Sequence, residues 1–225
     1  MADVVVPVFN EREILPLFLN RIEALPLTLN LIFIDNGSTD GTVEFLRARP
    51  GITLISHGEN LGYGRSLIDG LLCSTSEKVI IIDADCEYPP EAIPLLLDRL
   101  ATASVVYGSR FLSGGPVNMS HSRKWGNNIL TIFFNLLYRQ GLTDLYTGMK
   151  ALRRETFQGL SFTKSGFEHV VELAACLALR GHRIVEIPIA YTPRQTGLSE
   201  MRHLKEGLKA LRVMISYRLN NHGGN

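Results

Sequence analysis

The sequence has 225 residues, of which 45% are hydrophobic and 20% charged, and its formal net charge is +1. This composition is that of an ordinary globular protein, and the length suits one large domain or two closely packed halves. A charge near zero excludes a global field that attracts nucleic acid, so binding of an anion must depend on local clusters. The three cysteines, Cys73, Cys86 and Cys176, are widely spaced, which favours free thiols in a reducing cytosol over a disulfide framework or a zinc site.

Strand and helix patterns alternate through the first half of the chain. Apolar, mostly β-branched runs predict strands over residues 3–9, 29–34, 52–56, 79–82 and 104–107, with helical patterns between them over 10–25, 41–47, 60–73 and 91–100. Asn10 and Asp40 are expected to cap the first two helices. This repetition predicts an α/β fold with a mostly parallel central sheet between two layers of helices.

Three alternate carboxylates, Asp83, Asp85 and Glu87, follow the central strand. An open α/β sheet places its ligands at the carboxyl ends of the strands, and alternate residues of an extended segment point the same way. The three side chains could therefore present oxygens to one Mg²⁺ or Mn²⁺ ion. An isolated Asp-X-Asp is more often a solvated turn, so the assignment depends on the rest of the chain.

The second half mixes its elements and is expected to form the other wall of a cleft. A loop over 111–120, a helix over 121–138, loop and strand over 143–153, a helix over 167–179 ended by Gly181, and a strand over 183–190 are predicted in turn. Arg123 and Lys124 begin the first of these helices, where positive charge opposes the helix dipole. These two charges either serve an anionic ligand or form a solvated helix end. The polar segment 192–199 could act as a mobile flap.

The last helix, from Met201 onward, is amphipathic and basic. Its apolar residues Met201, Leu204, Leu208, Leu211 and Ile215 follow the spacing of one helical face, and Arg202, Lys205, Lys209 and Arg212 form another. Such a helix can lie on an anionic membrane, or its apolar face can pack on its own domain. With a first strand at about Asp3 and no apolar run of roughly 18 residues, we expect neither a signal peptide nor a membrane span. A cytoplasmic protein, at most peripheral on the membrane, is the expectation.

A transferase that uses a nucleotide sugar needs a pocket for base and ribose, a cation on the diphosphate and a facing acceptor site. Pro7, Phe9 and Glu11 end the first strand and Asp35 ends the second, where a carboxylate could accept an N–H of uracil or guanine. Asp83 and Asp85 would hold the cation that neutralises the diphosphate. Taken singly, Glu11 and Asp35 are more often a helix-start acid and a turn residue.

Five motifs carry a specific resemblance: Val5-Val-Pro-Val-Phe-Asn-Glu11, Ile34-Asp-Asn-Gly-Ser-Thr-Asp-Gly-Thr42, Asn60-Leu-Gly-Tyr-Gly64, Asp83-Ala-Asp-Cys-Glu-Tyr-Pro-Pro90 and Gly108-Ser-Arg110. In this order they resemble the motifs of the family 2 glycosyltransferases with the GT-A fold. The later Gly148-Met-Lys150, Glu168, Glu186-Ile-Pro188 and Arg194-Gln-Thr-Gly-Leu-Ser199 narrow the resemblance to the dolichol-phosphate mannose synthase-like branch. That branch moves a sugar from a nucleotide to a polyprenyl phosphate, and the resemblance covers about residues 3–200.

The resemblance implies an inverting, metal-dependent transfer from a UDP- or GDP-sugar to a dolichyl or undecaprenyl phosphate. It implies nucleotide contacts from Pro7, Phe9, Glu11, Asp35, Asp83 and Ala84, a Mg²⁺ or Mn²⁺ site at Asp83, Asp85 and Glu87, and catalytic roles for Asp85, Arg110, Arg123 and Arg194. Arginines suit phosphate oxygens, and an acceptor phosphate is already anionic and needs no general base. The expected organisation is a single GT-A domain over 1–225, with a nucleotide and metal half at 1–110, an acceptor half at 111–198 and the basic helix at 199–219.

The expected partners are the donor, the lipid phosphate, an anionic membrane surface and a separate membrane-anchoring subunit, with no nucleic acid. Three residues depart from the pattern of the branch. Asn36 replaces an Asp beside the nucleotide, Glu87 adds charge at the metal, and Glu200 stands where a phosphate-seeking lysine is usual. The last departure most weakens the assignment of a polyprenyl phosphate acceptor.

Two alternatives remain open. A family 2 transferase could instead act on a hydroxyl of a glycan or small metabolite, which requires a base; Asp144 is the first choice, before Glu168 and Glu172. A protein of another class could keep the fold and bind nucleotide sugars without catalysis. A dinucleotide-binding enzyme is excluded by the absence of G-x-G-x-x-G after the first strand, and a phosphatase would explain the Asp83 motif alone.

Overall fold

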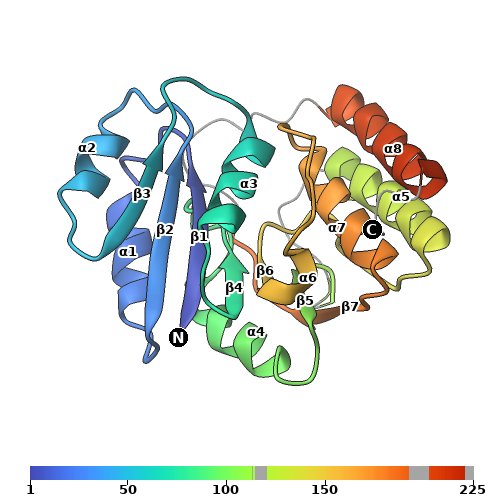
Figure 1. Ribbon diagram of the computed structural model, residues 1–225, viewed down its shortest axis with the longest axis horizontal. Coiled ribbons are helices and arrows are strands. Elements are labelled where there is room, and N and C mark those ends of the chain that lie inside the picture. Colours follow the sequence, from blue (N-terminus) through green and yellow to red (C-terminus); the bar gives the residue numbers. More distant parts are fainter. Residues whose placement is uncertain (113, 115–120, 193–202, 221–225) are drawn as a thin grey trace.

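The computed structural model describes residues 1–112, 114, 121–192 and 203–220, apart from the side chains of 121–123 and 203–205. Its strands are β1 (Ala2–Val8), β2 (Leu29–Asp35), β3 (Ile52–Ser56), β4 (Lys78–Ile81), β5 (Val105–Ser109), β6 (Lys150–Arg153) and β7 (Ile184–Pro188). They form one sheet in the order β3-β2-β1-β4-β6-β5-β7 (Figure 1). β6 runs antiparallel to its neighbours β4 and β5, and the remaining pairs are parallel. The predicted mostly parallel α/β sheet is confirmed.

Helices cover both faces of this sheet. They are α1 (Leu15–Glu23), α2 (Thr42–Arg47), α3 (Tyr63–Cys73), a short 3₁₀ helix η1 (Pro90–Ala92) that leads into α4 (Ile93–Arg99), α5 (His121–Tyr138), α6 (Arg154–Phe157), α7 (His169–Leu179) and α8 (His203–Asn220). Side chains alternate across the strands, so that Val5 belongs to the core that includes residues of α3, α5, α7 and α8, while Val4 and Val6 belong to the core that includes residues of α1, α2 and α4. The two cores make the expected three layers.

The two helix caps predicted for the first half, Asn10 and Asp40, have different outcomes. The first helix begins at Leu15, because Asn10 adopts a positive φ of 55° and its side chain does not cap that helix. Asn10 Oδ1 instead accepts the backbone N–H of Thr39 at 2.8 Å, which ties the ends of β1 and β2 together. Asp40 accepts the N–H of Thr42, the first residue of α2, at 3.0 Å, although Gly41 and not Asp40 occupies the N-cap position.

The C-terminal helix buries a face that the sequence did not single out. Ala210, Val213, Met214 and Tyr217 are buried in the core, whereas Leu208 and Ile215 are 58% and 44% exposed. Packing of the predicted apolar face on its own domain is therefore wrong for Leu208 and Ile215, while Met201 lies outside the described residues. None of the described helices is long and apolar enough to cross a membrane. The three cysteines are free, as expected.

Candidate active site

The predicted nucleotide residues gather where β1, β2 and β4 end. These strands are parallel neighbours, with Val8 of β1 paired to Asp35 of β2, so their carboxyl ends share one edge of the sheet. Pro7, Asp35 and Ala84 are buried there, while Phe9, Glu11 and Asp83 are partly exposed. The edge therefore brings together the side chains that the sequence assigned to the donor.

Asp35 organises the turn that follows β2. Its carboxylate accepts the N–H groups of Gly37 and Ser38 and the hydroxyl of Ser56, each at 3.2 Å. A side chain at Gly37 would lie 2.5 Å from the backbone of Glu59, so the turn presses against the loop before α3. The side-chain amide of Asn36 binds that loop twice: its nitrogen donates to Asn60 Oδ1, and its oxygen accepts the backbone N–H of Leu61. An amide at position 36 thus has a structural use in this chain.

Asp83 follows β4 and, among the described residues, accepts a hydrogen bond from the hydroxyl of Tyr63 at 2.8 Å. The Tyr63 ring stacks on Phe167 at 5.1 Å between centroids, and its neighbours Gly62 and Gly64 lie so close to residues 164–166 that a side chain at either would clash. The hydroxyl is thereby held in place from the second half of the chain. Burial, and then the charge of Asp85, raise the pKa of Asp83 to about 7.

The carboxylates after β4 fit a divalent cation in type and charge. Asp83, Asp85 and Glu87 are oxygen ligands of the kind that Mg²⁺ and Mn²⁺ prefer. Burial and the charge of Asp85 raise the pKa of Asp83 although the nearby Lys150 acts to lower it. Asp85 accepts the N–H of Glu87 at 3.0 Å, across a turn in which Cys86 has a φ of 58°. In the part of the chain that the structure describes, no three such side chains form a complete metal cage. Two carboxylates completed by phosphate oxygens remain a suitable set.

Two residues that the sequence did not assign to the site complete the surroundings of Asp83. Lys150, on β6, is fully buried, and burial lowers its pKa to about 8 while Asp83 and Asp144 act in the opposite direction. A side chain at Gly148 would lie 2.2 Å from Asp83 Oδ2, so only glycine fits there. Gly148 and Lys150 belong to one of the recognised motifs, but their contacts depend on β6 lying between β4 and β5, which local patterns did not predict.

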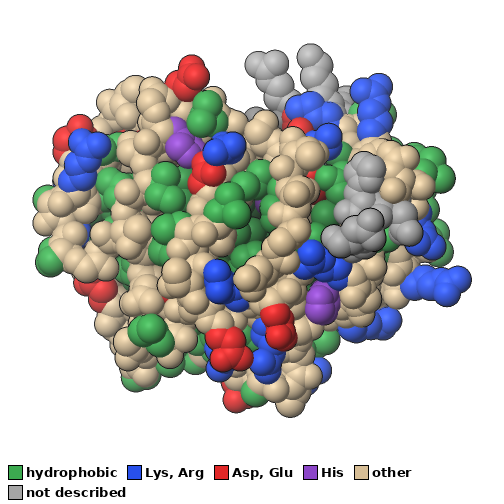
Figure 2. All heavy atoms as spheres, viewed as in Figure 1, with side chains coloured by type: hydrophobic (Ala, Val, Ile, Leu, Met, Phe, Trp, Pro, Cys, Tyr) green, Lys and Arg blue, Asp and Glu red, His purple; other side chains and the backbone are tan. Residues whose placement is uncertain are grey.

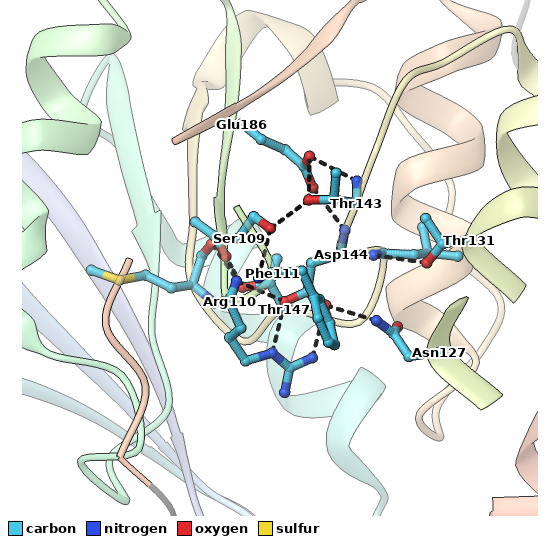
Figure 3. A network of polar contacts seen from close by, with 12 residues as sticks. Ser109, Arg110, Phe111, Asn127, Thr131, Thr143, Asp144, Thr147 and Glu186 are labelled. Carbon is cyan, nitrogen blue, oxygen red and sulfur yellow. Dashed lines mark hydrogen bonds and ion pairs between the residues drawn. The ribbon is translucent and has the colours of Figure 1, made fainter. Parts of the chain in front are cut away.

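Arg110 and Asp144 form a bidentate ion pair at the site (Figure 3). Arg110 donates from Nε and Nη2 to the two carboxylate oxygens of Asp144, at 2.7 and 2.8 Å. The Arg110 backbone N–H and the Asn127 amide add donors at 3.1 and 3.2 Å. Burial alone would lower the pKa of Arg110, but Tyr88 and Asp144 raise it above its ordinary value. The pair is therefore a charged, rigid element.

Glu186, on β7, holds the loop that carries Asp144. Its carboxylate accepts the N–H groups of Thr143 and Asp144 at 2.7 and 2.9 Å and the Thr143 hydroxyl at 2.9 Å (Figure 3). Thr143 in turn shares a 2.6 Å hydrogen bond with Ser109, and Thr147 donates to the carbonyl of Gly108. Hydrogen bonds through Thr143 and Asp144 thus connect the recognised Gly108-Ser-Arg110 and Glu186-Ile-Pro188 motifs. We call this hydrogen-bonded set the Arg110–Asp144 frame.

The three candidate bases have different surroundings. Asp144 and Glu172 are fully buried. Glu172 accepts hydrogen bonds from the Thr163 backbone and hydroxyl, His169 and Tyr217, so it joins α7 to α8. Glu168 lies 3.9 Å from Lys209 of α8. Of the two remaining predicted arginines, Arg123 has only its backbone in the described residues, at the start of α5, and Arg194 lies outside them.

Comparisons with known proteins agree with this geometry. The sequence matches Glycosyl transferase family 2 over residues 3–160. It is 30% identical to an undecaprenyl-phosphate mannosyltransferase of Micrococcus luteus, over 88% of this chain and 86% of that protein. It is 29% identical to a polyprenol monophosphomannose synthase of Mycolicibacterium smegmatis, over 88% of this chain and 80% of that one.

Among solved structures, glucosyl-3-phosphoglycerate synthase of Mycobacterium tuberculosis in complex with Mn²⁺ and UDP-glucose superposes with a TM-score of 0.71. The superposition covers 100% of this chain and 80% of that one, at 21% identity, and shows a shared GT-A fold. The fold and the family that the motifs resemble are therefore confirmed. Since the family match spans most of the sequence, this chain is a glycosyltransferase and belongs to glycosyl transferase family 2.

Proposed function

We propose that this chain transfers a sugar from a nucleoside diphosphate to a polyprenyl phosphate, with inversion at the anomeric carbon. An oxygen of the acceptor phosphate attacks the anomeric carbon as the bond to the diphosphate oxygen breaks, so a glycosyl phosphate and a nucleoside diphosphate form. The names of the Micrococcus and Mycolicibacterium relatives support the lipid phosphate as acceptor and mannose as the first sugar to test.

The engagement of Asp144 is the observation that carries the choice of acceptor. A hydroxyl acceptor needs a base within reach, whereas an anionic phosphate does not. Both oxygens of Asp144 are held by Arg110, and its side chain is fully buried. To act as a base it would have to leave a buried ion pair, which is costly because Arg110 would be left uncompensated. The geometry favours an acceptor that brings its own negative charge.

On the donor side, we assign Asp83 and Asp85 to a Mg²⁺ or Mn²⁺ ion, with Glu87 beside them, and the ends of β1 and β2 to the nucleotide. A bound divalent cation would neutralise the diphosphate leaving group. The carboxylate donors and the pKa of Asp83, which burial and Asp85 raise, support this assignment, as do Mg²⁺ and Mn²⁺ complexes of the structurally similar synthase. Tyr63 orients Asp83 through its hydroxyl.

On the acceptor side, we assign the phosphate to Arg110, Arg123 and Arg194. Asp144 uses Nε and Nη2 of Arg110, which fixes the guanidinium plane and directs Nη1 away from the pair. Tyr88, Tyr191 and Phe111 surround that plane, with ring centroids 5.5 to 5.7 Å from Cζ. A preorganised cation of this kind stabilises charge on the reacting phosphates without reorganisation. Contact with the membrane that holds the acceptor, directly or through an anchoring subunit, is part of the proposal.

The test is a panel of UDP- and GDP-sugars, including the mannosyl donor, incubated with the protein, Mn²⁺ and undecaprenyl phosphate in vesicles. We expect one donor to give a lipid-linked sugar in the organic phase, and calorimetry to show that its nucleotide binds more tightly with Mn²⁺. If donors bind but neither transfer nor hydrolysis occurs, the chain is a non-catalytic binding protein and the proposal fails.

A further inference from the structure

Four large apolar side chains project from α5 into solvent. Trp125, Ile129, Ile132 and Leu136 are 69%, 56%, 59% and 76% exposed. Their spacing of four, three and four residues places them on one side of the helix. The opposite side, which includes Asn127, Thr131, Phe134 and Tyr138, is buried in the protein. The exposed stripe is thus additional to the face that folds the helix onto its domain.

Helix α8 repeats this arrangement beside α5. Leu208, Ile215 and Leu219 are 58%, 44% and 76% exposed, at positions that again share one side of the helix. The two helices are neighbours, since the Tyr138 hydroxyl at the end of α5 donates to the carbonyl of Met214 at 2.8 Å (Figure 1). We call these seven side chains, Trp125, Ile129, Ile132, Leu136, Leu208, Ile215 and Leu219, the outer apolar face.

The charges around the outer apolar face are almost all positive. Arg139, directly after α5, and Lys209, Arg212 and Arg218 on α8 are exposed. Over residues 121–139 and 203–220 the sequence holds one acid, Glu206, which pairs with Lys209 at 2.9 Å. Figure 2 shows basic and apolar side chains along the edge where Figure 1 places α5 and α8. This combination of exposed apolar and basic groups complements an anionic lipid surface.

We propose that the outer apolar face docks the protein on an anionic lipid bilayer, with α5 lying in the interface beside α8. Trp125 is the residue type that prefers this depth, and monomeric proteins rarely expose such large apolar side chains in a continuous row. The inference concerns binding to lipid alone. The use of this binding, to bring the enzyme to its lipid acceptor, rests on the proposed function.

Helix α5 also connects this face to the active site. From its buried side, Asn127 donates to Asp144 at 3.2 Å, and Thr131 accepts the N–H of Leu145 at 3.3 Å. The helix that would lie on the lipid is therefore the helix that supports the Arg110–Asp144 frame.

Trp125 provides a direct probe, because it is the single tryptophan of the chain. The full protein is titrated with acceptor-free vesicles of phosphatidylcholine containing phosphatidylglycerol, without donor or metal. We expect its emission to shift to the blue, lipids brominated along their chains to quench it, and the protein to float with the vesicles. Added salt should weaken this binding, because exposed charges are screened.

Paired variants test the surface itself. Ile132→Ser with Leu136→Ser should lower vesicle affinity at least tenfold and leave transfer to a short-chain, water-soluble acceptor unchanged. Leu72→Ser with Leu95→Ser, on α3 and α4, is the matched control, since these leucines are 74% and 60% exposed, and it should bind as the wild type does. Arg212→Gln and Arg218→Gln should each lower affinity by about fivefold at low salt, and Arg47→Gln on α2 should not.

Three results would overturn the inference. One is an unshifted Trp125 emission with no flotation. Another is an equal loss of binding in the control pair, and the last is a dimer, seen by light scattering, that buries Trp125 without lipid. Vesicle binding in a protein that transfers no sugar would support the inference while contradicting the proposed function, so the two fail separately.

Discussion

Asp83 and Asp144 are carboxylates of one site with opposite surroundings. Asp144 is fully buried and accepts hydrogen bonds from Arg110 through Nε, Nη2 and the backbone, and from Asn127. Asp83 accepts the neutral hydroxyl of Tyr63, and burial and the nearby Asp85 raise its pKa to about 7 although Lys150 acts in the opposite direction. Among the described contacts, Asp144 forms a bidentate ion pair and Asp83 does not.

This difference separates a structural role from a binding role. A carboxylate whose oxygens are all used by a buried guanidinium can position its neighbours but has nothing left for a ligand. A carboxylate that is buried beside a second carboxylate, as Asp83 is beside Asp85, gains from a cation that arrives from outside. The sequence proposes both residues for the site, Asp83 through a motif and Asp144 as a candidate base, and only their partners distinguish their roles.

Replacing each acid by its amide should give the largest contrast. Asp144→Asn leaves Arg110 buried without a counter-charge, so we expect the free energy of unfolding to fall by about 3–5 kcal/mol. Asp83→Asn removes repulsion with Asp85, so the unfolding free energy of the metal-free protein should stay unchanged or rise. Chemical denaturation followed by circular dichroism measures both values.

A surface ion pair supplies the control for that contrast. Arg21 donates to Glu91 at 2.6 and 2.8 Å, but the two side chains are 29% and 52% exposed. Glu91→Gln should therefore cost no more than about 1 kcal/mol. If Asp144→Asn cost as little as Glu91→Gln, the rigid role of the Arg110–Asp144 pair would be wrong.

Asp85→Ala tests the binding role. We expect sugar transfer to fall by about 10²–10³-fold, because the diphosphate loses part of its charge neutralisation. The melting temperature should change little, since Asp85 is only partly buried. Full transfer activity in the variant would contradict the metal assignment.

Tyr63→Phe tests the support of Asp83 with a smaller change. The variant keeps the ring stacked on Phe167 and removes only the hydroxyl. Loss of such an orienting bond lowers metal affinity by about tenfold, which a titration with Mn²⁺ and nucleotide measures. Tyr138→Phe also removes a buried hydroxyl bond, to Met214, but far from the site, and should leave that affinity as it is.

The stability of the protein should depend on pH in opposite directions through Asp83 and through Glu172. Because the pKa of Asp83 is raised to about 7, the folded protein keeps a proton there that the unfolded chain has lost above pH 4. Stability of the metal-free protein should thus fall as pH rises from about 4 to about 7, and Mn²⁺ affinity should rise about tenfold per pH unit up to 7. Glu172 behaves oppositely: burial raises its pKa, but hydrogen bonds lower it to about 2, so its contribution is lost as pH falls from 4.5 through 2. Urea melts and metal titrations across this range test both signs.

Much of the fold and of the donor side follows from the sequence, for a local reason. The strands end in the motif residues, and parallel strands bring their carboxyl ends together, so Asp35 and Asp83 could be assigned to one edge before any coordinates. The helix start at Asn10 was misplaced because its side chain bonds Thr39, which is distant in sequence.

The rest could not be predicted because it depends on tertiary contacts. Tyr63 reaches Asp83 only because residues 164–167 fix its ring, and Lys150 lies beside Asp83 only because β6 inserts antiparallel between β4 and β5. The sequence left the choice between a membrane and a packing role for the last helix open for a related reason. Two faces of α8 are apolar, and hydropathy alone does not tell which one meets the core.

The most direct test of the account compares two acceptors that differ by one group, undecaprenyl phosphate and undecaprenol, in vesicles with the donor that binds and Mn²⁺. The account predicts a lipid-linked sugar on the phosphate alone, because the phosphate is already a nucleophile and Asp144 is not free to activate a hydroxyl. Transfer to undecaprenol at a comparable rate would contradict the account. It would show that the site contains a general base, a role that the account denies to Asp144 because Arg110 holds it.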